Sequence, residues 1–177
     1  MAESQLSLTE YAVLGILAER PAHGFAVSKS LAPDGEIGRI LTVRRPLVYR
    51  ALDRLVAAGL AEPRHTEPGE AGPQRTVHRI TRVGRRRLNR WLARPVDHVR
   101  DLRIEFQLKL AMLARSESSP LDLIRAQRAA IQPTLTLLEL PGGATTDHLD
   151  LWRRHNAAAV SGYLQDLETR YSNAPPE

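Results

Sequence analysis

Arginine is the residue type in this sequence whose number and spacing best suit binding chemistry. Residues 39–90 hold thirteen arginines against four acidic residues, whereas the remainder of the chain holds twelve basic and sixteen acidic side chains. The chain prefers arginine over lysine throughout, but that bias does not explain why the arginines gather in one segment. Guanidinium groups match phosphate oxygens and guanine edges, and the release of condensed counterions favours their binding to a polyanion. We therefore expect a nucleic acid as the partner of this segment.

Other chemistry finds little support in the sequence. The absence of cysteine excludes disulfides, thiolate catalysis and thiolate metal sites. There is no Gly-x-Ser-x-Gly motif and no glycine-rich phosphate loop, so Asp97–Asp101, which is superficially similar to a catalytic loop, lacks the parts that a phosphotransferase needs. His148 and His155 lie about two helical turns apart, too far to share one metal ion easily. We expect no enzymatic activity, no metal and no cofactor.

The composition indicates a soluble, cytoplasmic protein with a packed interior. The sequence has no apolar run of about 18 residues, the length that spans a membrane, and its N-terminus lacks a basic-then-apolar signal pattern. A hydrophobic content of 42% is enough for a core. The length of 177 residues suits one small domain with an extension, or two small domains that share a core.

The element that must present the central arginines is a helix predicted to begin near Arg45 and to end at about Ala58. Pro46 is tolerated in the first turn, and Gly59 suits the position after the last turn. At about 100° per residue, one side of this helix is apolar and the other is polar and basic. The side predicted to be buried carries Val48, Ala51, Leu52, Leu55 and Val56. The side predicted to be exposed carries Leu47, Tyr49, Arg50, Asp53 and Arg54.

A two-stranded hairpin is predicted directly after this helix. Leu60–Arg64 and Arg75–Ile80 are short extended segments, and residues 65–74 between them are rich in turn formers and predicted to form a long tip. Thr81 then begins a basic helix that ends near Leu92, and Pro95 separates this helix from the C-terminal part of the chain.

Two further helices are predicted on the N-terminal side. Ser7 and Glu10 have the spacing of a capping box, and the apolar segment Tyr11–Ala18 after them is expected to be a buried helix. Phe25–Ala32 is predicted to form a short second helix, with a loop or turn from there to Thr42.

The C-terminal part is predicted to be entirely helical. We expect helices at Asp97–Arg115, at Pro120–Leu140 and from about Thr146 to Tyr171, with Pro141-Gly-Gly as a stop before the last one. Apolar and aromatic residues recur along the last helix at multiples of three and four, which indicates a face that packs against a partner. These residues are Trp152, Val160, Tyr163, Leu167 and Tyr171.

The predicted order of elements, with positive charge on the third helix and the hairpin, is that of a winged helix-turn-helix. The expected fold class is mainly α with a small β-hairpin wing: an N-terminal winged helix-turn-helix over residues 1–95 and a C-terminal α-helical dimerisation domain over residues 96–177. A helix fits the major groove of B-DNA, and its N-terminal dipole favours phosphate. A basic hairpin beside it reaches the neighbouring backbone or minor groove.

The candidate DNA-binding residues come from the third helix, the residues just before it and the hairpin. They are Thr42, Arg44, Arg45, Leu47, Tyr49, Arg50, Arg54, Arg64, Gln74 and Arg75. An arginine pair one turn apart, such as Arg50 and Arg54, is often only a solvated surface, so the hypothesis depends on the whole pattern rather than on one pair.

Five segments in order also resemble the PadR family of transcriptional regulators. They are EYAVLGILA at 10–18, PAHGF at 21–25, RPLVYRALDRL at 45–55 with Gly59-Leu60, GPQR at 72–75 and ITRVG at 80–84. The resemblance covers about residues 6–92, and segments 96–101 and 105–110 are similar to members with a longer C-terminal helical domain. Phe25 and His78 stand where a tyrosine is common in the family.

The resemblance implies a homodimeric regulator, usually a repressor, with the third helix and the hairpin on double-stranded DNA. The two-fold symmetry of such a dimer predicts a pseudo-palindromic operator. The resemblance also implies dimerisation through the C-terminal helices with a contribution from the first helix, and in some relatives a response to a small-molecule effector. The candidate dimerisation residues are Leu8, Tyr11, Trp152, Val160, Tyr163 and Leu167. Trp91, Trp152 and Tyr163 are candidates to line a ligand pocket, although aromatic residues at helical spacing are more often core or interface. The alternative function is a winged-helix module whose arginine face docks an acidic protein.

Overall fold

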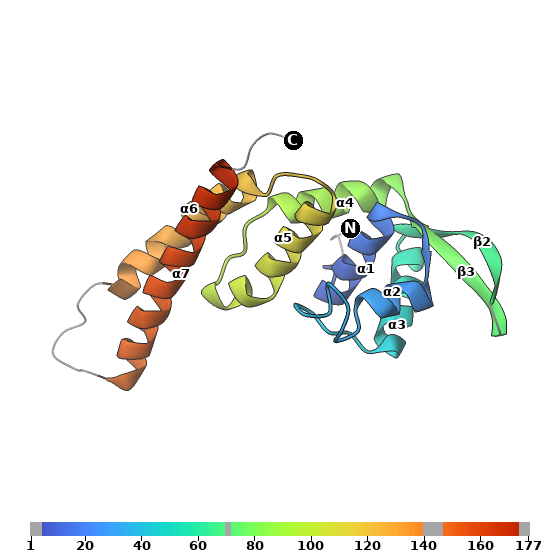
Figure 1. Cartoon of the computed structure of the whole chain (residues 1–177), viewed down its shortest axis with the longest axis horizontal. Coiled ribbons are helices and arrows are strands. Elements are labelled where there is room, and N and C mark those ends of the chain that lie inside the picture. Colours follow the sequence, from blue (N-terminus) through green and yellow to red (C-terminus); the bar gives the residue numbers. More distant parts are fainter. Residues whose placement is uncertain (1–4, 70–71, 140–146, 174–177) are drawn as a thin grey trace.

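The protein is elongated, with the winged helix-turn-helix at one end and a pair of long helices at the other (Figure 1). The computed structural model describes residues 5–69, 72–139 and 147–173, so the predicted stop at Pro141-Gly-Gly lies outside the described residues. The predicted class, mainly helical with a small wing, is confirmed. Among the described residues, none of the helices combines the length and the apolarity needed to span a bilayer.

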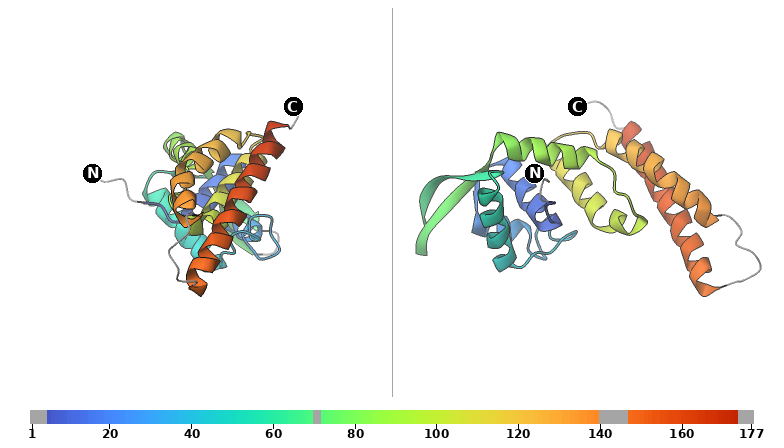
Figure 2. Two further views of the ribbon diagram at one scale, coloured as in Figure 1. Left: turned by 90° about the vertical axis from the view of Figure 1, so that its left-hand side faces the viewer. Right: turned by 180° about the vertical axis from the view of Figure 1, so that it is seen from behind.

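Helix α1 (Leu8–Glu19) lies at the centre of the winged helix-turn-helix. Its N-terminus has the predicted capping box, in which the Ser7 backbone N–H donates to Glu10 Oε2 at 2.6 Å and the Glu10 N–H donates to Ser7 Oγ at 3.3 Å. The helix is buried continuously from Glu10 to Leu17 because it packs between α3 (Arg45–Ala57) and α4 (Arg82–Ala93), as both Figure 1 and Figure 2 show. Helices α3 and α4 therefore lie on opposite sides of α1.

The sheet contains one strand that the sequence pattern did not predict and two that are longer than predicted. Strand β1 (Ala22–His23) pairs with β3 (Gly72–Ile80), which pairs in turn with β2 (Ala61–Gly69), and both pairings are antiparallel. The expected long tip at residues 65–74 is wrong, because pairing continues through Thr66 with Thr76 and Glu67 with Arg75. β2 is an edge strand with two irregularities in its register, so it accommodates its prolines without ending.

Thr81 connects the hairpin to α4 and to the end of α3. Its hydroxyl accepts a hydrogen bond from the Gly84 N–H at 3.0 Å and donates to the Gly59 carbonyl at 2.8 Å. Gly59 has φ 67°, a conformation that glycine adopts without strain. Helix α2 (Gly24–Ser30) completes the unit and begins directly after β1.

The predicted single helix over Asp97–Arg115 is wrong. A 3-10 turn η1 (Val99–Arg103) and the non-helical Ile104 precede α5 (Glu105–Arg115). The break lets Leu102 enter the core, and the Gln107 side chain donates to the freed Leu102 carbonyl at 3.2 Å. Helices α6 (Leu121–Glu139) and α7 (His148–Ser172) then pack against each other as an antiparallel pair.

Two hydrophobic cores share α5. Leu108 and Met112 pack into the core of the winged helix-turn-helix, whereas Phe106 and Leu110 pack into the core formed with α6 and α7. Arg115 at the end of α5 donates from Nε and Nη2 to the carboxylate of Glu19, both at 2.6 Å, and also pairs with Glu36 in the segment before α3.

The buried Gln127 of α6 binds the segment that follows α4. Its Oε1 accepts from the Val96 N–H at 2.8 Å, and its Nε2 donates to the Val96 carbonyl at 3.0 Å. The chain that leaves α4 is thereby held against α6 by two backbone hydrogen bonds.

Candidate nucleic-acid interface

Helix α3 has the two faces that its sequence predicts. Val48, Ala51, Leu52 and Leu55 are buried against the rest of the winged helix-turn-helix. Leu47, Tyr49 and Arg50 point outward and are exposed. Pro46 lies in the first turn and Arg44 occupies the N-cap without a side-chain hydrogen bond, so the first backbone N–H groups of the helix lie beside arginine side chains.

The start of α3 and the wing meet at Phe25, the second residue of α2. The Arg45 guanidinium carbon lies 5.2 Å from the centre of the Phe25 ring, and that of Arg75 in β3 also lies 5.2 Å from it. Arg45 is in addition 5.7 Å from the centre of the Tyr49 ring. The structure thus brings together three predicted residues, Arg45, Tyr49 and Arg75, around a phenylalanine that the sequence pattern did not assign to the interface.

The remaining candidates surround this cluster or lie farther along the hairpin. Thr42 is exposed, and its hydroxyl donates to the Gly38 carbonyl at 2.8 Å, which fixes the segment that leads into α3. Arg64 on β2 and Gln74 on β3 are exposed on the wing. None of these positions lies under α6 or α7, which occupy the other end of the molecule (Figure 1).

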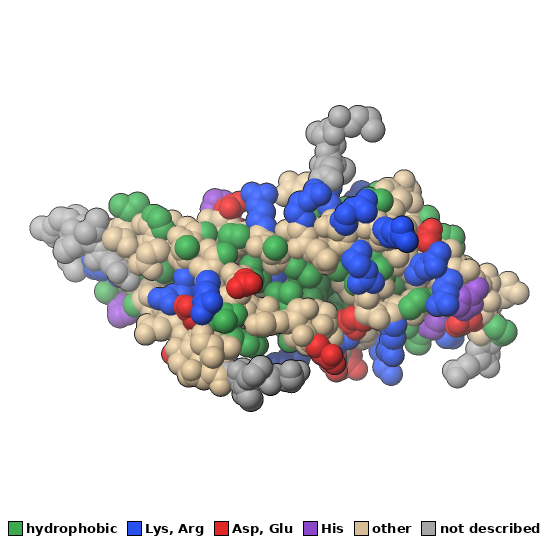
Figure 3. Space-filling view, turned by 90° about the horizontal axis from the view of Figure 1, so that it is seen from above, with side chains coloured by type: hydrophobic (Ala, Val, Ile, Leu, Met, Phe, Trp, Pro, Cys, Tyr) green, Lys and Arg blue, Asp and Glu red, His purple; other side chains and the backbone are tan. Residues whose placement is uncertain are grey.

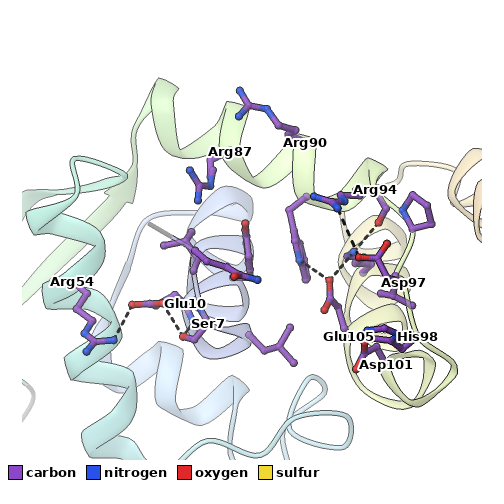
Figure 4. Close-up of a pocket in the computed structure, with 18 residues that line it drawn as sticks. Ser7, Glu10, Arg54, Arg87, Arg90, Arg94, Asp97, His98, Asp101 and Glu105 are labelled. Atoms are coloured by element: carbon purple, nitrogen blue, oxygen red, sulfur yellow. Dashed lines mark hydrogen bonds and ion pairs between the residues drawn. The ribbon is translucent and has the colours of Figure 1, made fainter. Parts of the chain in front are cut away.

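Arg54 is placed differently from the other arginines of α3. Its Nη1 lies 3.6 Å from Glu10 Oε1, and 68% of the Arg54 side chain remains exposed while that of Glu10 is only 7% exposed. Figure 4 shows this ion pair beside the capping box of α1. Arg54 therefore belongs both to the outward face of α3 and to the wall of a cavity next to α1.

That cavity has a volume of about 1040 Å³ and lies between the start of α1, α4 and the start of α5 (Figure 4). Tyr11 and Trp91 line it as a stacked pair with ring centres 4.2 Å apart. The nearly inaccessible Lys109 donates to the Arg94 carbonyl at 2.7 Å and pairs with Glu105 at 2.8 Å. Burial lowers the pKa of Lys109, and the hydrogen bond to Glu105 opposes that shift.

The thirteen arginines of residues 39–90 do not share one face. Helix α4 carries Arg82, Arg85, Arg86 and Arg90 on its exposed side, and Figure 3 shows basic side chains gathered over the half of the molecule that holds this helix. Since α1 packs between α4 and α3, the exposed side of α4 is separate from the outward face of α3, and of these four arginines Arg90 lines the cavity that Arg54 also lines. The sequence shows the concentration of charge but not its division between two faces.

The candidate dimerisation residues also differ in their surroundings. Tyr11 is buried in its own chain, and Leu8 is half-buried beside the same core. Val160 and Leu167 pack against the core shared with α6. Trp152 is 63% exposed, and Tyr163 is exposed at its edge, where its hydroxyl hydrogen-bonds Gln107 of α5 at 2.8 Å. Trp91 lines the cavity near α1, so the three aromatic residues predicted to line a pocket are not together.

His78 lies near the end of β3, the central strand of the sheet, opposite both Ala22 and Pro63. Its Nδ1 is inaccessible and has no hydrogen-bond partner within the described part of the chain. Burial lowers the pKa of His78, while the nearby Asp53 carboxylate opposes the shift. The ring at this position therefore favours its neutral form.

Residues 13–90 match the model of the transcriptional regulator PadR-like family. This match runs from α1 to α4 and includes α3 and the wing. Over this segment the chain is similar to PadR-like regulators. The resemblance inferred from the five motifs is confirmed over these residues, and the family is one of transcriptional regulators rather than enzymes.

Solved structures similar to this chain include two of nearly the same length. PadR of Bacillus subtilis, crystallised in complex with operator DNA, is 17% identical with a TM-score of 0.49, over 93% of this chain and 99% of that chain. The smu.1604c protein of Streptococcus mutans UA159 is 17% identical with a TM-score of 0.44, over 93% of this chain and 98% of that chain. No curated protein matches the chain.

Proposed function

We propose that this protein is a sequence-specific, DNA-binding transcriptional regulator whose α3 enters the major groove while the wing contacts the adjacent backbone or minor groove. The observation that carries the proposal is the meeting of Arg45 from α3 and Arg75 from the wing on one ring, on a surface that α6 and α7 leave open. Two elements with independent cations thus face the same side of the molecule, as a duplex requires.

Within this proposal the candidate residues have distinct roles. Arg50 and Arg54, with Tyr49 and Leu47, point outward from α3 and would approach base edges. The residues at the start of α3 and on the wing would contact phosphates, since phosphate contacts set the position of a protein on DNA. These are Thr42, Arg44, Arg45, Arg64, Gln74 and Arg75.

We further propose that the protein acts as a homodimer and as a repressor. Residues 1–95 would bind DNA and residues 96–177 would dimerise, with α5 belonging to both cores. The exposed Trp152 and Tyr163 give α7 an aromatic face. Val160 and Leu167 are partly buried against the core that α7 shares with α6. A small-molecule effector is part of the proposal, and the cavity lined by Tyr11 and Trp91 is its candidate site.

The deciding experiment is selection of bound duplexes from a random-sequence pool by the full-length protein. A DNA-binding regulator is expected to enrich a two-fold symmetric site, and a dimer places its two half-sites about one helical turn apart. Binding of random duplex is then measured against salt, where log K falls by about 0.9 per phosphate contacted for each unit of log salt. A module that docks an acidic protein would enrich no site and would bind duplex weakly.

Light scattering during size-exclusion chromatography tests the dimer separately. A monomer at micromolar concentration would contradict the homodimer while leaving DNA binding open to the selection experiment. The two parts of the proposal therefore fail independently.

A further inference from the structure

We propose that Phe25 is a positioning residue for DNA binding: its ring holds the guanidinium groups of Arg45 and Arg75 so that α3 and the wing meet one stretch of DNA together. This inference rests on the proposed function and assigns a role to a residue outside the predicted set. It concerns how the two cations are oriented before DNA arrives.

The Phe25 ring is partly exposed and lies beside two arginine side chains. Phe25 is 44% exposed, and both guanidinium carbons lie 5.2 Å from its centre, within the distance of about 6 Å at which a cation is attracted to an aromatic face. The His23 ring is the other aromatic neighbour, with ring centres 6.3 Å apart. A half-exposed phenylalanine with two arginines on it is poorly explained as core packing.

The backbone of Phe25 is fixed relative to both elements that supply the arginines. On the wing side, β1 ends two residues before Phe25 and pairs with β3 through Ala22 with His78 and His23 with Val77. On the α3 side, Gly24 packs so closely on Tyr49 that a Cβ there would lie 2.7 Å from the tyrosine ring. The His23 Nδ1 also accepts from the Ala26 N–H at 3.1 Å and thereby caps α2. The ring is therefore a fixed point between two separate elements.

A fixed ring has a physical use here because arginine side chains are long and flexible. Ordering one such side chain on binding weakens affinity by roughly two- to twelvefold, and a side chain that is already ordered avoids that loss. Two guanidinium groups near each other also repel, and the electron-rich face of the ring offsets this repulsion. Phe25 would thus act through Arg45 and Arg75 rather than by contacting DNA itself.

The test compares Phe25→Leu, which removes the ring but keeps an apolar side chain, with Phe25→Tyr, which keeps the ring. The probe is the duplex that the wild-type protein selects from a random pool. Two exposed cation–π contacts predict that Phe25→Leu weakens binding by roughly five- to thirtyfold, and that Phe25→Tyr binds within about twofold of wild type. Equal binding by wild type and Phe25→Leu would overturn the proposal.

A double-mutant cycle separates positioning from direct contact. The Arg45→Gln/Arg75→Gln protein is expected to lose affinity, and adding Phe25→Leu to it is expected to change the affinity by less than about twofold, because the groups it positions are gone. A further loss as large as in the wild-type background would show that the ring contacts DNA directly, and the positioning role would be wrong.

A measurement without DNA distinguishes failure of this inference from failure of the proposed function. In NMR spectra of the free, full-length protein, the side-chain methylene protons of Arg45 and Arg75 are expected to be shifted upfield by the ring in wild type and Phe25→Tyr, but not in Phe25→Leu. Absence of the shift in wild type refutes the arrangement. If the shift is present and no duplex is bound, the proposed function fails instead, and with it the purpose assigned to the ring.

Discussion

The separation of the arginines onto two faces predicts that equal losses of charge have unequal effects on DNA binding. The first variant replaces Arg44 and Arg45 at the start of α3 with glutamine, and the matched control replaces Arg82 and Arg86 on α4. Both variants lose two positive charges from exposed positions, and both leave the buried face of their helix intact. Only the first pair lies on the side of α1 where Arg45 and Arg75 meet at Phe25.

The magnitude depends on the number of phosphates that each pair would neutralise. If Arg44 and Arg45 each contact one phosphate, their loss reduces the slope of log K against log salt by about 1.8, because each contact contributes about 0.9. Between about 50 and about 200 mM salt, the affinity of the α3 variant should therefore fall by a factor roughly twelve times smaller than the affinity of wild type does. The α4 variant is expected to keep the wild-type slope, because α4 is on the far side of α1.

The assay is fluorescence anisotropy with a random-sequence duplex across a series of salt concentrations, after thermal unfolding has shown that both variants are folded. A general effect of net charge on long-range attraction is itself screened by salt, so it would act on both variants alike and would not produce a difference in slope between them. An equal loss of slope in the α4 and α3 variants would refute the division between the two faces, since DNA would then contact both.

Three further outcomes are expected. If Arg50 reads a base, Arg50→Ala should weaken the free energy of binding to the selected site by about 1–3 kcal/mol and that to random duplex by much less. Equal losses on the two duplexes would make Arg50 a phosphate contact. Truncation after residue 143 removes α7 and should give a monomer by light scattering with severely weakened operator binding; unchanged binding would contradict the assigned interface. His78 has a lowered folded-state pKa, so the stability it contributes is present above its unfolded value of 6.5 and is lost as pH falls through the folded value. The midpoint temperature of thermal unfolding should therefore fall less steeply between pH 7.5 and 5 for His78→Gln than for wild type.

The helices of the winged helix-turn-helix were predictable because local signals and burial agree there. The capping box at Ser7 and Glu10, the glycine after α3 and the apolar side of α3 each specify the same element that packing then stabilises. The hairpin was predictable in kind but not in length, because turn-forming residues in β2 are accommodated by register irregularities that depend on the partner strand. Strand β1 has two residues and no periodicity, so only its pairing with β3 reveals it.

The break before α5 was hidden for a different reason. Residues 97–115 have a continuous amphipathic pattern, but α5 must supply two cores on different sides, with Leu108 in one and Phe106 in the other. A helix that contacts only one core would satisfy the same pattern. The demand for a break comes from tertiary packing, which overrides the local preference.

The candidate site was predictable as a set of exposed residues but not as an arrangement. Helical spacing alone places Tyr49 and Arg50 outside and Val48 inside, and both placements are confirmed. The convergence on Phe25 joins α2, α3 and β3, and no spacing rule relates positions 25, 45 and 75. The pairing of Arg54 with Glu10 is non-local in the same way. A count of charges does not show which way the side chains point, so the sequence does not separate the basic face of α4 from the outward face of α3.

The two hydrogen bonds from the Gln127 side chain to the N–H and the carbonyl of Val96 have a consequence for the geometry of any operator. In a dimer joined through α7, the contact between Gln127 and Val96 and the shared helix α5 would set the orientation of each winged helix-turn-helix relative to the dimer axis. That orientation fixes the distance between the two copies of α3, and hence the number of base pairs in the spacer between half-sites. A stiff connection of this kind selects one spacer length, so operators altered by a single inserted base pair should be discriminated even when both half-sites are unchanged.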